Sequence, residues 1–192
     1  MDTATVVKMR VIGGKYRRRV LQSPESSKTR PMLDRMRETL FNILQFEIEG
    51  VVFADLFAGT GAVGIEALSR GARKAIFVEQ NGSAAGVISA NLQLLGAEAE
   101  ALVVRSPVLE ALPRLEADVW FIGAPYPDHE AYLATMAALV EKNPRLVVVQ
   151  HDRKLKLPDH FDELTCYRTR RMGSNVLSFF RMEPTSEATA SS

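Results

Sequence analysis

The chain has 192 residues, a length typical of one α/β domain with a small appendage. Hydrophobic residues make up 46% of it, which is enough for a sizeable core, and no apolar run approaches the about 18 residues of a membrane-spanning helix. The single cysteine excludes an internal disulfide, and the histidines show no metal-ligand spacing, so we expect a cytoplasmic protein without a metal site.

The net charge of +1 is distributed unevenly along the chain. Residues 1–40 carry a net charge of +6, and the remainder carries −5. This asymmetry indicates that a polyanion contacts the N-terminal end, although a solvated basic surface would give the same composition.

The N-terminal segment begins with residues 1–8, which we expect to form a flexible leader. Residues 9–22 alternate in polarity around a pair of glycines, a pattern that predicts a β-hairpin. Its tip is rich in groups that bind phosphates or stack on bases, namely Lys15, Tyr16, Arg17, Arg18 and Arg19.

A helix is predicted to follow, with a proline in its first turn and an apolar face that packs into the core. Its basic residues, which we expect to lie away from that face, are Arg30, Arg35 and Arg37. Residues 9–48 are therefore predicted to form a basic hairpin and helix ahead of the main domain.

The most informative stretch covers residues 51–71 and reads VVFADLFAGTGAVGIEALSRG. An apolar run ends in Asp55, a turn with Gly59 and Gly61 follows, and a helical pattern starts near Ala62. Strand, glycine turn and helix in this order are typical of nucleotide-binding α/β folds, because glycine lets the backbone approach a ligand closely. The alternative is a glycine turn that merely joins a strand to a helix.

Two acidic residues indicate which ligand this turn binds. Asp55 ends the first apolar run, and Glu79 ends the next one, where an acid that binds ribose hydroxyls is expected. Asp55 would repel a pyrophosphate but attract a cationic amino-acid group. S-adenosylmethionine has a ribose, a sulfonium and an ammonium but no phosphate, so it fits this pair of carboxylates better than NAD does.

The rest of the chain alternates between predicted strands and helices. We expect helices over 84–95 and 128–142, a short helix or loop over 107–115, strands over 101–104, 118–122 and 146–149, and an antiparallel pair over 165–170 and 176–182. This pattern predicts an α/β fold with a seven-stranded, mostly parallel sheet that has helices on both faces. Residues 49–182 would form this ligand-binding domain, and residues 183–192 a disordered tail.

Ligands of such sheets bind at the carboxyl ends of the strands. Asp55, Glu79, Arg105 and Gly123 all lie at predicted strand ends, so we expect four separate segments to converge on one cleft.

The stretch from Asp55 to Ala72 closely resembles the S-adenosylmethionine-binding motif of RsmD-type 16S ribosomal RNA guanine-N2 methyltransferases. MRVIGGKYR at 9–17, RMRETLFNIL at 35–44 and LSFFR at 177–181 are similar to other parts of that family, so the resemblance covers roughly residues 9–182. It implies a Rossmann-like methyltransferase that methylates the exocyclic amine of a guanine in 16S ribosomal RNA or a 30S-type particle, and we expect a monomer.

The resemblance also implies roles for particular residues. The hairpin and helix arginines would grip RNA. The expected cofactor-binding residues are Asp55, Phe57, Ala58, Gly59, Thr60, Gly61, Glu79, Gln80, Arg105 and Ser106. The expected catalytic residues, which would hold the target base, are Gly123, Ala124, Pro125 and Tyr126.

Two departures from the family pattern concern the chemistry. The family's catalytic loop reads Asp-Pro-Pro-Tyr or Asp-Pro-Pro-Phe, whereas Gly123 and Ala124 open the loop of this chain. The family also has an Asp after its third strand, where this chain has Arg105 and Ser106. The missing loop carboxylate leaves backbone carbonyls and the Tyr126 ring to hold the base.

The alternative function is therefore a homologue that binds RNA or S-adenosylmethionine without efficient turnover. A third function, that of a dinucleotide-dependent oxidoreductase, would need a catalytic Tyr-Lys or His-Asp pair, and none presents itself.

Overall fold

The computed structural model describes residues 9–23, 34–124 and 128–183. Its helices are α1 (Asp34–Ile43), α2 (Ala62–Ser69), α3 (Gly82–Leu95), α4 (Val108–Ala111) and α5 (His129–Val140), with 3-10 turns η1 (Glu98–Glu100) and η2 (Leu112–Arg114). Its strands are β1 (Met9–Arg10), β2 (Val20–Leu21), β3 (Val52–Leu56), β4 (Lys74–Val78), β5 (Ala101–Val104), β6 (Val119–Ile122), β7 (Leu146–Asp152), β8 (His160–Phe161), β9 (Leu164–Met172) and β10 (Asn175–Met182).

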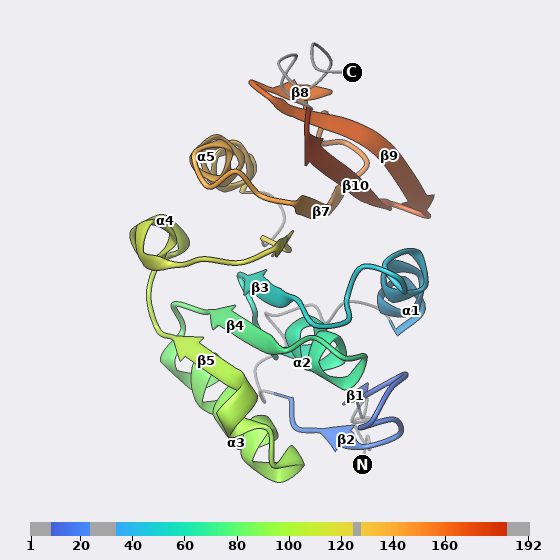
Figure 1. Ribbon diagram of the computed structural model, residues 1–192, viewed down its shortest axis with the longest axis vertical. Coiled ribbons are helices and arrows are strands. Elements are labelled where there is room, and N and C mark those ends of the chain that lie inside the picture. The colour runs from blue at the N-terminus through green and yellow to red at the C-terminus, as the bar shows by residue number, and fades with distance from the viewer. Residues whose placement is uncertain (1–8, 24–33, 125–127, 184–192) are drawn as a thin grey trace, which may run out of the picture.

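The main sheet has eight strands in the order β5-β4-β3-β6-β7-β10-β9-β8 (Figure 1). Strands β3 to β7 pair in parallel, and β10 pairs antiparallel with both β7 and β9. The mostly parallel sheet is thus confirmed. It has one strand more than expected, because the two-residue β8 is too short to leave a periodic pattern in the sequence.

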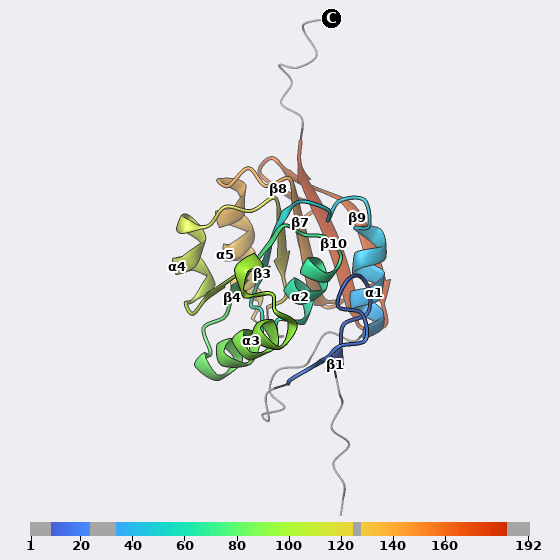
Figure 2. The same cartoon turned by 60° about the horizontal axis from the view of Figure 1, so that its bottom comes forward.

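Helices cover both faces of the sheet, as predicted. Apolar residues of α1, α2 and α3 pack on one face, around Phe53, Phe77 and Phe121. Residues of α4 and α5 pack on the other, around Leu56, Trp120 and Ile122 in the alternating positions of the strands. Figure 2 shows α4 and α5 together on one side and α1 and α2 on the other. The strands carry apolar residues on both faces because helices bury both.

Local signals fix several helix boundaries. The Asn81 side chain accepts hydrogen bonds from the N–H groups of Ser83 and Ala84 at the start of α3, and Gly96 ends this helix in the left-handed conformation. The Asp128 side chain caps α5 in the same way by accepting from the Ala131 N–H. No helix in the part of the chain that the structure describes is long and apolar enough to cross a membrane.

The predicted N-terminal hairpin is smaller than expected. β1 and β2 pair over only two residues each, and residues 13–18 form turns between them. Met9, Val11 and Leu21 share a buried core with α2 and α3. The intervening turn lies so close to α2 that a Cβ atom on Gly14 would stand 1.7 Å from the Ser69 carbonyl oxygen, so the paired glycines serve this contact rather than a long hairpin.

Glu66 of α2 attaches this N-terminal turn to the sheet domain. The side chain is fully buried, and its two carboxylate oxygens accept from the N–H groups of Ile12 and Gly13, both at 2.8 Å. The Nε of Arg70 donates to it at 2.8 Å, and the Nε of Arg37 in α1 lies 3.6 Å away. One buried carboxylate therefore joins α1, α2 and the N-terminal turn.

Candidate cofactor and catalytic site

Four parallel strands end in register. The last residues of β5, β4, β3 and β6 are paired across the sheet as Val104, Val78, Leu56 and Ile122. The residues that follow them, which therefore lie side by side at the carboxyl edge, are Arg105, Glu79, Phe57 and Gly123. The structure thus brings together the segments that the sequence predicts to converge.

The turn between β3 and α2 is held in a left-handed course. Gly59 and Gly61 have φ angles of 56° and 75°, and Phe57, which is not a glycine, has a φ of 62°. The turn is anchored by the Ala58 N–H, which donates to the Val78 carbonyl at 2.9 Å. A non-glycine residue in this conformation is strained, and such strain clusters at ligand-binding sites.

Asp55 lies beneath this turn with only 2% of its surface exposed. Its Oδ2 accepts from the Gly64 N–H in the first turn of α2 at 2.9 Å. Burial raises the pKa of Asp55 to about 8 and the Glu79 charge adds to the rise, while the hydrogen bond from Gly64 opposes it. Near neutral pH the structure therefore holds a carboxyl group that a cationic ligand would help to ionise.

This shift predicts a pH dependence of stability. The folded-state pKa of Asp55 lies above its unfolded value of 3.8, so its contribution to stability is full below about pH 4 and is lost as pH rises toward about 8. Asp55→Asn removes this dependence. The difference in the free energy of unfolding, variant minus wild type, should increase by at least about 1 kcal/mol when the pH is raised from 5 to 8. Urea denaturation at both pH values checks this, and parallel pH profiles would contradict it.

Glu79 is half-buried beside the turn. Its Oε2 accepts from the Gly59 N–H and its Oε1 from the Asn81 N–H, both at 2.8 Å. Each oxygen keeps a lone pair for a further donor, such as a ribose hydroxyl. The carboxylate thus already holds the glycine turn and the start of α3 in place beside the position predicted for the ribose.

The other predicted cofactor residues surround this point. The Arg105 guanidinium packs so closely on the start of α3 that a Cβ on Gly82 would stand 2.6 Å from its Cζ. Thr60 is buried and its hydroxyl donates to the Met9 sulfur at 3.6 Å. Gln80 is exposed, and the Ser106 hydroxyl donates to the Pro107 carbonyl. A pyrophosphate site would favour a basic side chain at the glycine turn. Among the described residues, no basic side chain forms a hydrogen bond with this turn.

The start of the predicted catalytic loop follows β6. Gly123 donates its N–H to the Leu56 carbonyl at 3.3 Å, so the loop starts next to the glycine turn. The φ of Gly123 is outside the left-handed region, but a Cβ there would stand 2.9 Å from the Phe121 ring. Pro125 and Tyr126 lie outside the described residues, so their predicted role in holding the base stays a prediction.

Tyr132 is a residue that the sequence analysis missed. It is fully buried in α5, and its hydroxyl lies 2.6 Å from the Ala124 carbonyl oxygen and 2.9 Å from the Gln150 carbonyl oxygen of β7. It therefore fixes the direction of one of the carbonyls expected to hold the base. The only hint in the sequence was the position of this tyrosine near the start of the helix that follows the loop.

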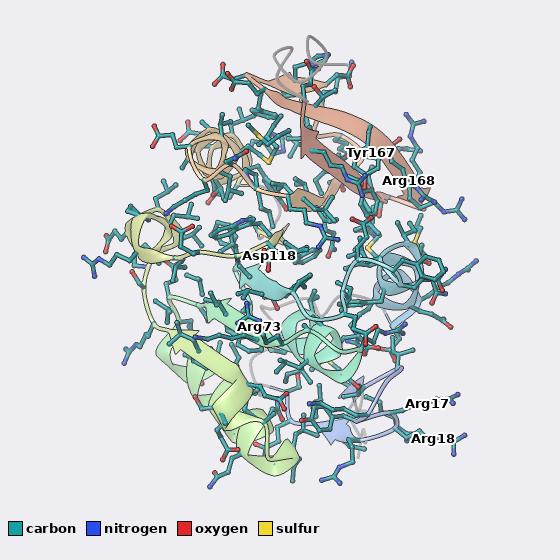
Figure 3. All side chains as sticks on the ribbon, viewed as in Figure 1. Arg17, Arg18, Arg73, Asp118, Tyr167 and Arg168 are labelled. Atoms are coloured by element: carbon teal, nitrogen blue, oxygen red, sulfur yellow. The ribbon has the colours of Figure 1, made fainter. Side chains whose placement is uncertain are left out.

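The predicted RNA-binding residues of the N-terminal turn differ in how exposed they are and in whether they already have a partner. Arg17 and Arg18 are exposed and project from the turn (Figure 3). Lys15 is exposed but forms an ion pair with Glu100 at 2.6 Å, and its Nζ lies 4.8 Å from the centre of the half-buried Tyr16 ring. Arg19 donates to the Leu94 carbonyl at 3.0 Å. Arg17 and Arg18 are thus the most available of this group.

The prediction for Arg37 needs correction. Its side chain is fully buried in α1, where it contacts Asp34, Glu66 and the Arg10 carbonyl, so it cannot contact RNA in this fold. The charge suggested a surface role, but position 37 is four residues before the buried Phe41 and shares its helix face. Arg35 is exposed, and Arg30 lies outside the described residues.

The sequence and the fold match known proteins over most of the chain. A family model described as conserved hypothetical protein 95 matches residues 9–181. Ribosomal RNA small subunit methyltransferase D of Escherichia coli (strain K12) is 32% identical over 189 residues, covering 95% of this chain and 94% of that protein. YlbH of Bacillus subtilis is 32% identical over 181 residues, covering 90% and 98%. A solved structure of yhhF from Escherichia coli superimposes with a TM-score of 0.82 at 30% identity, covering 92% and 99%.

Proposed function

The chain belongs to the family described as conserved hypothetical protein 95, and from this premise we propose that it methylates the N2 amine of a guanine in small-subunit ribosomal RNA. It is a methyltransferase, with S-adenosylmethionine as the methyl donor. The observation that carries the proposal is the common edge of β3, β4 and β6, which places Asp55 and Glu79 beside the loop that starts at Gly123.

The two carboxylates divide the work of holding the donor. Glu79 accepts from the ribose hydroxyls with the lone pairs that its backbone contacts leave unused. Asp55, kept largely neutral by burial, ionises beside the cationic amino-acid part of the donor. The left-handed glycines remove the side chains that would otherwise fill the space above the turn.

The donor supplies a methyl group made electrophilic by its bond to a positively charged sulfur. The lone pair of the guanine N2 forms the new N–C bond while the C–S bond breaks, and N2 then loses a proton to solvent. This lone pair is delocalised into the ring, so the protein must orient it. The Ala124 carbonyl, fixed by Tyr132, and the Gly123 carbonyl are the acceptors that this chain offers to the amine.

A weakly active or inactive homologue is the second candidate, and one observation favours it. Gly123 offers no carboxylate, and the Ala124 carbonyl already accepts a hydrogen bond from Tyr132. The amine would therefore meet fewer and weaker acceptors than an Asp at this position provides.

Removing the Glu79 carboxylate tests the cofactor site. Glu79→Ala should weaken S-adenosylmethionine binding by about 1.5–3 kcal/mol, the usual cost of losing hydrogen bonds to a charged group. Titration calorimetry measures this, with NAD as a ligand that should bind neither protein. Glu98→Ala, which removes an exposed carboxylate of η1, is the matched control and should bind like the wild type. Unchanged affinity in a folded Glu79→Ala variant would remove Glu79 from the site.

The function itself is tested by methyl transfer. The protein is incubated with labelled S-adenosylmethionine and small-subunit ribosomal particles from cells that lack this enzyme. Label in the RNA supports the proposal. Label only in protein, or none in the presence of normal donor and RNA binding, contradicts it, and the second result favours the binding-only homologue.

A further inference from the structure

A second basic surface lies far from the N-terminal turn in sequence. It is formed by the exposed end of β9 and the two residues after β7. We call it the hairpin cluster, and its members are Arg153, Lys154, Arg168, Arg170 and Arg171. All five are exposed, and no carboxylate of the described residues lies within ion-pair distance of any of their side chains.

The fold holds these residues together. The Arg153 N–H donates to the Ser174 carbonyl at 2.8 Å, which joins the end of β7 to the tip of the β9–β10 hairpin. Arg168 and Arg170 lie opposite the buried Phe179 and Leu177, so they point to the sheet face that α1 covers. Arg171 points to the other face. The cluster therefore wraps around the outer edge of β9.

Charge is segregated along this hairpin. The end of β9 that lies toward the tip carries Arg168, Arg170 and Arg171. The opposite end, near β8, carries the acids Asp159, Asp162, Glu163 and Glu183 and one arginine, Arg181. A strand that only needed solubility would be expected to mix both signs. Asp152 lies beside the cluster, and its Oδ1 accepts from the Lys154 backbone N–H.

The basic end lies at the same edge of the sheet as the catalytic loop. Arg170 pairs with Leu177, and Leu177 pairs with Gln150 of β7. The Gln150 carbonyl and the Ala124 carbonyl both contact the Tyr132 hydroxyl. Neighbouring strands are about 4.8 Å apart, so Arg170 is about 10 Å from Gln150 across the sheet.

The strand that carries the cluster is braced. A register shift between Phe179 and Phe180 places Tyr167 against Phe179, with ring centres 6.3 Å apart. The Arg181 guanidinium stacks on Tyr167 at 4.6 Å and donates to both oxygens of Glu47 at 2.6 and 2.7 Å. The Arg181 side chain is thus engaged, whereas Arg168, one residue after Tyr167, is exposed.

We propose that the hairpin cluster binds phosphates of the RNA substrate, as a second contact in addition to Arg17 and Arg18. In the view of Figure 3, Arg17 and Arg18 lie below α1 and Arg168 lies above it. The inference rests on the proposed function, which supplies the RNA. The cluster lies at the edge of the sheet where the base is methylated, and each guanidinium can bind a phosphate with two hydrogen bonds.

Arginines on an open strand edge have another use, since they discourage edge-to-edge pairing of sheets. The two roles give different results on charge removal. Loss of a protective charge would cause self-association with unchanged RNA affinity, whereas loss of a phosphate contact would weaken RNA binding and flatten its salt dependence.

The test is the triple variant Arg168→Gln, Arg170→Gln, Arg171→Gln. Its matched control replaces Arg73, Arg114 and Arg145 by Gln, which removes the same charge from exposed positions before β4, β6 and β7, at the opposite edge of the sheet. Binding to small-subunit ribosomal RNA is measured over a range of KCl concentrations, together with S-adenosylmethionine binding and light scattering. We expect the triple variant to lose about 2 from the slope of log affinity against log salt and roughly tenfold or more in affinity. Donor binding should be unchanged, and the control should match the wild type.

A triple variant that binds RNA like its control, while the wild type binds and methylates RNA, would overturn this inference and leave the proposed function standing. Self-association of the triple variant with unchanged RNA affinity would overturn it in favour of edge protection. A wild-type protein that does not bind RNA would overturn both.

Discussion

The double variant Gly123→Asp, Ala124→Pro is expected to methylate RNA at least about tenfold faster than the natural protein in single turnover. An Asp at position 123 would accept from the guanine amine and stabilise the positive charge that grows on N2 during transfer. A charge-assisted hydrogen bond contributes about 1.5–3 kcal/mol, which corresponds to about 10- to 200-fold in rate. The backbone permits the change, because Gly123 is outside the left-handed region.

Two further variants separate charge from shape. A new Cβ at position 123 meets the Phe121 ring at 2.9 Å, so part of the gain is offset by a shift of this buried ring. Gly123→Asn carries the same bulk without the charge and should stay near the natural rate. Gly123→Ala measures the steric cost alone through its effect on the free energy of unfolding. A natural protein that is already as fast as the double variant would show that backbone carbonyls suffice.

Glu66→Ala is expected to lower the free energy of unfolding by about 3–5 kcal/mol, because it leaves the buried Arg37 with only the exposed Asp34 as a carboxylate partner. The change also removes the acceptor of the Ile12 and Gly13 N–H groups. The N-terminal turn should therefore loosen from α2. Chemical denaturation measures the first effect, and faster hydrogen exchange at these two amides reports the second.

Glu100→Ala is the matched control, since Glu100 also holds the N-terminal turn, through Lys15, but at the surface. Exposed ion pairs contribute at most about 1 kcal/mol, so this variant should stay close to the wild type. If both variants lose equally little stability, Glu66 does not anchor the turn as we describe.

The central site could be predicted because its signals are local. The glycine turn is encoded within a few residues, and the structure shows it, with Gly61 in the left-handed conformation just before α2. The convergence of Glu79 and Gly123 follows from a general rule, that parallel strands present their carboxyl ends at one edge. The strand pairing places the residues just before both positions next to Leu56.

What the sequence analysis missed depends on long-range contacts. Arg37 looked like a surface cation, and only the fold shows the buried Glu66 that pairs with it, 29 positions further along. The two glycines suggested the tip of a long hairpin, whereas they allow close contact with Ser69. Tyr132 acquires its role from two carbonyls on separate segments. No periodicity within one segment reports such pairs.

The most direct measurement is the identity of the methylated nucleoside. Excess protein is incubated with labelled S-adenosylmethionine and small-subunit particles from cells that lack the enzyme, and the RNA is digested to nucleosides and analysed by mass spectrometry. We predict that the label appears in N2-methylguanosine and that Glu79→Ala lowers its amount at donor concentrations that just saturate the wild type. Label in a different nucleoside, or an unlabelled RNA despite bound donor, would contradict the account.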